Sequence, residues 1–124
     1  MVKDRDGFRN QHSNESNDEY FTNKSYYYLE HSHVNIFVLY CKAHGEGVAM
    51  ELQYACQMLR SKIPCCAILK DVSCKMSSMI EGQIRIAKLL VDEFDGNNDD
   101  CDDQIIRFML ARCVNFLTAK FYLI

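Results

Sequence analysis

The sequence predicts an all-α fold: antiparallel helical hairpins, repeat-like or arranged as a small bundle, after a disordered N-terminal tail. Two segments, 48–59 and 80–94, repeat apolar residues at three- and four-residue steps, the spacing that places side chains on one helix face. A composition of 48% hydrophobic and 25% charged residues is typical of a globular domain. Residues 1–24 are mostly polar, too poor in apolar groups to offset chain entropy.

The 124 residues suffice for one domain with a single core. We expect a flexible polar tail over residues 1–24 and a helical domain over 25–124. The formal net charge of -3 and the pI near 5.7 give no global positive field, which disfavours nucleic acid. No apolar run approaches the roughly 18 residues of a membrane span, and the first ten residues do not form a signal peptide. We therefore expect no membrane partner.

The seven cysteines indicate the compartment. They are odd in number and lie mostly among apolar residues, where a reduced thiol packs as a small hydrophobic group. This pattern predicts an intracellular, reducing and cytoplasmic environment.

The elements follow in chain order. Residues 26–41 contain dense apolar stretches that fit a buried helix or a buried strand equally. Residues 48–59 form the first clear helix. Pro64 then disfavours helical geometry at Ile63 and removes a backbone donor, so we expect a break at 61–64 and a new element after it.

The second half continues the helical pattern. Residues 80–94 are predicted as one helix, and the acidic stretch 95–100 as a turn that ends it. Asp102 or Asp103 caps the next helix, which we expect over 104–116. The apolar residues of this predicted helix include Ile105, Ile106, Met109, Leu110 and Cys113. Residues 117–124 are apolar and end without a polar cap, as in an incomplete solenoid.

A faint internal repeat accompanies these helices. Three pairs place an apolar residue five positions before a cysteine; they are Ile36 with Cys41, Leu69 with Cys74, and Phe108 with Cys113. Each pair precedes a second stretch in which an alanine is followed by apolar residues, beginning at Ala49, Ala87 and Ala119. Small residues at such points let antiparallel helices approach closely.

Over residues 34–124 the chain resembles the helical-hairpin repeats of the pentatricopeptide and tetratricopeptide families. The resemblance is most visible at 82–94, with a second copy built from 39–43, 49–52 and 58–60. It implies stacked hairpins, and its pentatricopeptide branch implies single-stranded RNA binding by the first helix of each hairpin. A plain antiparallel bundle, whose packed helices share small and apolar residues, stays open beside it.

Histidine and cysteine residues supply the metal candidates. His31, His33, Cys41 and His44 have side chains that bind zinc, and the spacing of Cys41 and His44 suits a shared ion. Scattered histidines and buried thiols explain the same residues, so no metal site is assigned.

The vicinal pair Cys65 and Cys66 is the candidate nucleophile. A reactive thiolate needs a neighbouring base or cation, and Lys62 and Lys70 are near in sequence. A core position is the favoured interpretation of this pair.

Three further motifs have simpler explanations. Gly45, Glu46 and Gly47 precede a helix like a phosphate loop but lack the Lys-Ser/Thr ending, so a turn is favoured. Residues 95–106 offer carboxylates for calcium, but Ile106 replaces the bidentate glutamate. Residues 90–95 resemble the death motif of apoptosis regulators, with Ala87 at the leucine anchor; a helix packed in a core has the same spacing.

The function predicted is a non-enzymatic helical binding module, a scaffold for protein-protein interaction with an unidentified protein partner. Apolar groups near the end of the chain, Phe121, Tyr122 and Leu123, are the expected contacts. Two alternatives stay open. One is pentatricopeptide-type RNA binding, disfavoured by the acidic charge; the other is a small α/β enzyme or signalling domain with strands at 34–41 and 63–69 around the 48–59 helix. No catalytic or cofactor-binding residue and no cofactor is assigned.

Overall fold

The computed structural model describes residues 16–41, 46–73 and 75–122, which form two compact units. Within the first unit, α2 (Asn17–His31) begins at a capping box. The Ser16 hydroxyl accepts a hydrogen bond from the Glu19 amide at 3.2 Å, and the Glu19 carboxylate accepts one from the Ser16 amide at 3.4 Å. The polar tail expected over 1–24 therefore contains a helix from Asn17 onward, while residues 1–15 lie outside the described residues.

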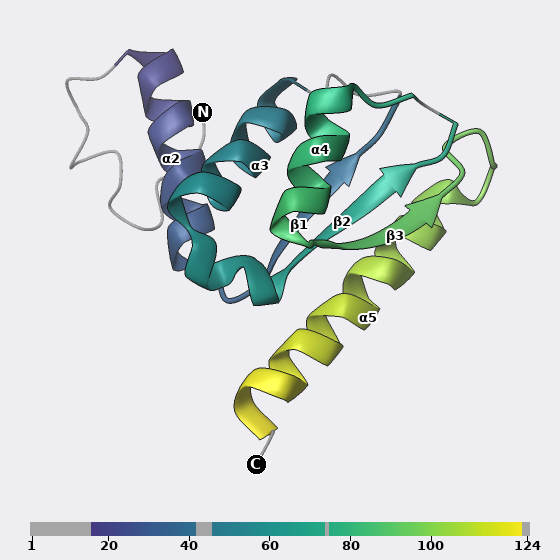
Figure 1. The fold of residues 1–124 in the computed structure, drawn as a ribbon. Helices are drawn as coiled ribbons and strands as arrows, with labels where there is room; N and C mark the ends of the chain where they lie inside the picture. The colour runs from purple at the N-terminus through teal and green to yellow at the C-terminus, as the bar shows by residue number, and fades with distance from the viewer. Residues whose placement is uncertain (1–15, 42–45, 74, 123–124) are drawn as a thin grey trace. The chain divides into compact units, whose positions relative to one another are not determined.

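The second unit is an α/β structure, and the all-α prediction is wrong. Its three strands are β1 (Asn35–Leu39), β2 (Cys66–Asp71) and β3 (Leu90–Phe94), and they form a parallel sheet in the order β1-β2-β3 (Figure 1). β2 is the central strand and is buried over nearly its whole length. A central parallel strand is apolar on both faces, so its sequence lacks the period of two that identifies a half-exposed strand.

Helices cover both faces of this sheet (Figure 1). α3 (Glu46–Met58) and α4 (Ser78–Ala87) connect consecutive strands on one face, and α5 (Cys101–Tyr122) packs on the other against β2 and β3. A 3-10 helix, η1 (Arg60–Cys65), joins α3 to β2 and contains Pro64. The predicted helix at 48–59 is confirmed as α3. The break expected at 61–64 falls within η1, and the new element expected after it is β2, which begins at Cys66.

The predicted helix over 80–94 is wrong in its second half. α4 ends at Ala87 because Lys88 adopts a left-handed conformation with φ 56°. The Lys88 amide donates to the Arg85 carbonyl and the Leu89 amide to the Ile84 carbonyl, each at 3.1 Å, the pattern of a Schellman C-cap. Residues 90–94 then form β3, so the death-motif interpretation, which needs a helix there, is also wrong.

The core between the sheet and α5 is built on Leu69, Phe94 and Cys101. Partly buried side chains complete it: Ile36 and Val38 of β1, Tyr40 directly after β1, and Ile105 and Phe108 of α5. α5 begins at Cys101 and extends beyond the predicted bounds of 104–116. Among the described residues, no helix combines the length and apolar character that crossing a membrane requires.

Candidate functional site

The carboxyl ends of the three strands meet at Asp71, the last residue of β2. Its side chain is completely buried, and it accepts four hydrogen bonds. The Cys41 amide donates at 3.1 Å, the Gly96 amide at 2.9 Å, and the amide and hydroxyl of Ser73 at 2.9 and 2.6 Å. Because these donors follow β1, β3 and β2 respectively, one carboxylate ties together the three loops at this edge.

Electrostatics keep Asp71 ionised. Burial alone raises the pKa of a carboxyl group, but the hydrogen bonds from Ser73, Gly96 and Cys41 outweigh burial and lower the pKa of Asp71 to about 2. A carboxylate with this pKa and four donors is a poor general acid or base near neutral pH. Gly96 is needed beside it, since a Cβ there would lie 2.1 Å from the Asp71 Oδ2. We therefore assign Asp71 a structural role.

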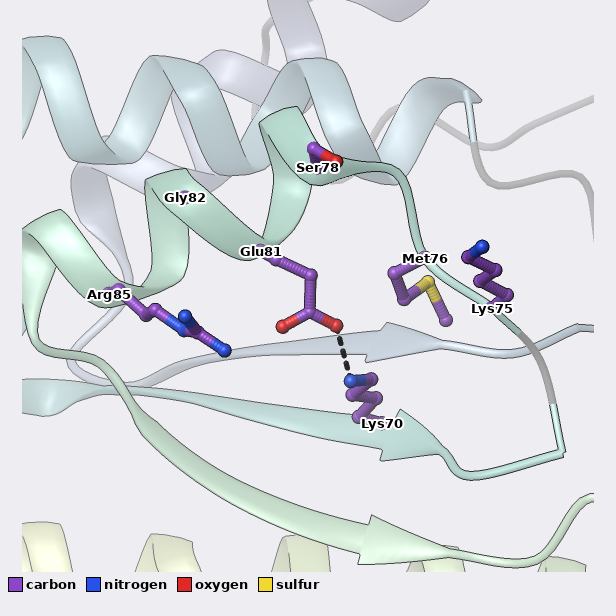
Figure 2. Close-up of a pocket in the computed structure, with 7 residues that line it drawn as sticks. All are labelled: Lys70, Lys75, Met76, Ser78, Glu81, Gly82 and Arg85. Carbon is purple, nitrogen blue, oxygen red and sulfur yellow. Dashed lines mark hydrogen bonds and ion pairs between the residues drawn. The ribbon is translucent and has the colours of Figure 1, made fainter.

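A cavity of about 480 Å³ lies between the end of β2 and α4, on the face of the sheet opposite α5. Figure 2 shows Glu81 of α4 reaching toward Lys70 of β2, with Arg85 one turn further along the same helix. Lys70 and Glu81 form an ion pair, and the hydrogen bond from Lys70 lowers the pKa of Glu81. Lys75 adds a further positive charge to the lining. The cavity thus has three cations against one carboxylate.

The outer face of α5 exposes a series of large apolar side chains. Ile106, Leu110, Val114 and Phe121 are 54%, 61%, 61% and 57% exposed, and Met109 is 37% exposed. Between Gln104 and Ala119 the helix has only two charged residues, Arg107 and Arg112, and Arg112 is bound to Asp92 of β3 through hydrogen bonds of 2.7 and 2.9 Å. A helix face that stays in water normally carries more charge than this.

Four apolar residues of α5, two of them exposed, follow a regular spacing. Ile106, Leu110, Cys113 and Leu117 are four, three and four residues apart, which aligns them along one side of a helix in the manner of a coiled-coil seam. Cys113 and Leu117 are partly buried. We name these four residues the α5 seam. Val114 and Phe121 flank it, so an apolar band runs along most of the helix.

The zinc candidates are distributed over both units. His31 belongs to α2, where its Nδ1 is 2.8 Å from the Tyr27 carbonyl oxygen. His33 precedes β1, and its Nδ1 lies 3.2 Å from the Lys120 amine. Cys41 follows β1, and His44 lies outside the described residues. Within the described ranges no cluster of three or more His, Cys, Asp or Glu residues suits a metal ion.

The cysteine pair occupies the junction of η1 and β2. Cys66 is buried, and its thiol donates a hydrogen bond to the Lys62 carbonyl at 3.2 Å. Burial raises the pKa of Cys66 to about 11, which disfavours the thiolate that a nucleophile requires. The structure thus favours the core interpretation of Cys66. Cys41, Cys56, Cys65, Cys66, Cys101 and Cys113 are all free thiols, and Cys74 lies outside the described residues.

The loop candidates have ordinary roles. Gly47 lies in the first turn of α3, and Gly45 is outside the described residues. In the segment proposed for calcium, Asp95 and Asn98 organise a turn by accepting backbone hydrogen bonds, and α5 already begins at Cys101. Of the expected apolar contacts, Phe121 is exposed, while the Tyr122 side chain and Leu123 are not described.

Three features of the structure were not predicted from the sequence. Asp71 directly follows the apolar run of β2, and an acid at the end of a buried strand was the available signal for it. The sequence points to Lys70 only as a neighbour of Cys65 and Cys66. The sequence does not divide the apolar residues of α5 between its two sides, whereas in the structure Ile105 packs inside and Ile106 is exposed.

No family model, curated protein or solved structure matches this chain. The resemblance to helical-hairpin repeats therefore stays a prediction. The stretch 82–94 that carried it comprises most of α4 and all of β3.

Proposed function

We propose that this chain is a non-enzymatic binding domain that contacts protein through the outer face of α5. The observation that carries this proposal is the exposure of Ile106, Leu110, Val114 and Phe121 on one helix. Apolar surface of this kind is stabilised when a second apolar surface covers it. A helix with regularly spaced apolar side chains suits a helical partner surface.

The polar groups of the sheet edge support the non-enzymatic part of the proposal. Asp71 is fully engaged by backbone and hydroxyl donors. The hydrogen bond between the Tyr40 hydroxyl and the Cys101 sulfur, with burial, raises the pKa of Tyr40 to about 12. General acid-base catalysis works best with pKa values near the ambient pH, and neither group meets that requirement.

The test compares two aspartate substitutions on α5. Leu110→Asp places a charge in the α5 seam, whereas Asn115→Asp places the same charge at an exposed position outside the apolar band. Tagged full-length chains are used to capture proteins from a cell extract to which the untagged chain has been added. We expect a set of proteins retained by the unmodified chain and by Asn115→Asp but lost with Leu110→Asp. Identical sets for all three chains would contradict the proposal.

A second candidate function is the binding of a small anionic ligand, as expected of a ligand-binding α/β domain. The excess of positive charge around the cavity at Lys70, Lys75 and Arg85 favours it, and ligands of open parallel sheets bind outside the carboxyl ends of the strands. Inorganic phosphate is a suitable probe. It should raise the melting temperature of the unmodified chain but not that of Arg85→Glu, and an equal effect on both would remove this candidate.

A further inference from the structure

The α5 seam extends at both ends into residues of opposite charge. Asp103 lies three residues before Ile106, and Lys120 lies three residues after Leu117. Both side chains are exposed, and the Lys120 amine reaches the Nδ1 of His33 at 3.2 Å. The three-four spacing therefore runs without interruption from Asp103 to Lys120. Its centre is apolar, with an acidic residue at the start and a basic residue at the end.

The order of residues along the seam, from Asp103 to Lys120, is complementary to the same order read in reverse. When a second α5 is laid along the first in the antiparallel direction, Asp103 of each copy meets Lys120 of the other. The same register places Ile106 opposite Leu117 and Leu110 opposite Cys113. Every apolar residue of the seam then faces an apolar residue, and each end places opposite charges together. An isologous contact of two-fold symmetry requires this kind of self-complementarity.

A parallel arrangement lacks these advantages. It would place Asp103 beside Asp103 and Lys120 beside Lys120, and like charges in contact are destabilising. It would also align the two helix dipoles, whereas the antiparallel arrangement brings the positive end of each helix near the negative end of the other. The charges of α5 therefore select one direction.

We propose that the partner of the α5 seam is a second copy of this chain, bound through antiparallel α5 helices. The inference rests on the proposed function, because it identifies what covers the apolar face of α5. The matched length from Asp103 to Lys120 is about 27 Å at 1.5 Å per residue. A single helix pair of this length is a small interface, so the dimer is reversible and depends on concentration.

The test measures the dimer dissociation constant of the full chain by sedimentation equilibrium, with circular dichroism as a check on folding. Asp103→Lys and Lys120→Asp each convert both end contacts into like-charge pairs, and each should raise the constant about tenfold. The double substitution restores opposite charges and should return the constant to within about twofold of the original. Leu110→Asp should abolish the dimer, and Asn115→Asp should leave it unchanged.

Three results would overturn the inference: a chain that is monomeric at all accessible concentrations, a dimer insensitive to Leu110→Asp, or a double charge reversal that fails to restore affinity. The proposed function fails separately. If the chain is monomeric but extract proteins still require an unmodified Leu110, the second-copy inference falls and protein binding by α5 stands. If the chain is monomeric and capture ignores Leu110, both fall.

Discussion

The two sides of α5 differ in what they contact. The inner side packs against Leu69 and Phe94 through Ile105 and Phe108, and its one cation, Arg112, is bound to Asp92. The outer side exposes apolar groups at Ile106, Leu110 and Val114. The inner side has the partners that folding provides. The fold of one chain therefore explains the residues on the inner side of α5, but not the exposed apolar residues on its outer side.

In the Asp71 network, four hydrogen bonds satisfy one buried carboxylate. Gly96→Ala disturbs this network and should have the largest effect on stability. The added Cβ would lie 2.1 Å from the Asp71 Oδ2, so the carboxylate must shift away from its donors. We expect a loss of about 3 kcal/mol in the free energy of unfolding, measured by urea denaturation. Gly82→Ala is the matched control, since a Cβ there meets no atom within 4 Å. A loss below about 1 kcal/mol would contradict the close packing at Gly96.

Asp71→Asn should destabilise the fold by about 2 kcal/mol, because an amide cannot accept all four hydrogen bonds, and it should also change the pH dependence. The pKa of Asp71 is about 2 in the folded chain and near 3.9 when unfolded. A lowered pKa stabilises the fold above the unfolded value, and this stabilisation is lost as the pH falls toward 2. Urea titrations between about pH 6 and pH 2 should therefore show a shallower acid loss for Asp71→Asn. Parallel pH profiles for both chains would show that Asp71 does not contribute this loss.

The two arginines of α5 allow a direct comparison of its sides. Arg112 makes a two-point contact with Asp92 and is about a quarter exposed, so Arg112→Ala should cost about 1 kcal/mol of unfolding free energy. Arg107 is exposed, and Arg107→Ala should change the same quantity by less than about 0.5 kcal/mol. Thermal melts of dilute protein test both, and equal losses would remove the distinction between the two sides.

The smallest effect on stability is expected on the outer side itself. Leu110 is 61% exposed, so Leu110→Asp should change the unfolding free energy of the dilute monomer by less than about 0.5 kcal/mol. A loss of several kcal/mol in denaturant titrations would mean that Leu110 is part of the folding core, and the exposed band would no longer stand as a binding surface.

The helices were easier to predict than the sheet. α3 and the centre of α5 follow a clear three-four spacing and were found. β1 and β2 match strands only of the α/β alternative, at 34–41 and 63–69, and not of the favoured all-α prediction. A strand buried on both faces has no alternation to distinguish it from a buried helix. β3 falls within the predicted 80–94 helix because its apolar residues continue the helical spacing. Lys88, which ends that helix in a left-handed conformation, is not the glycine that usually signals such an ending.

The candidate site was less accessible to sequence reasoning. The sequence predicts that the apolar residues of 105–113 lie on a helix, but not which of them face the sheet. That division depends on the parallel sheet beneath α5, which the all-α prediction lacks. The Asp71 network depends on three loops brought together by the same sheet, so its donors are far apart in sequence.

A cross-link at the proposed two-fold contact tests the central claim most directly. The antiparallel register places position 110 of one copy opposite Cys113 of the other. Leu110→Cys, in a chain where the exposed Cys41 is replaced by serine, should form an intermolecular disulfide between positions 110 and 113 under mild oxidation. Mass spectrometry of the digested dimer should identify that pair. A monomeric product, or disulfides distributed over unrelated cysteines, would contradict the antiparallel α5 contact.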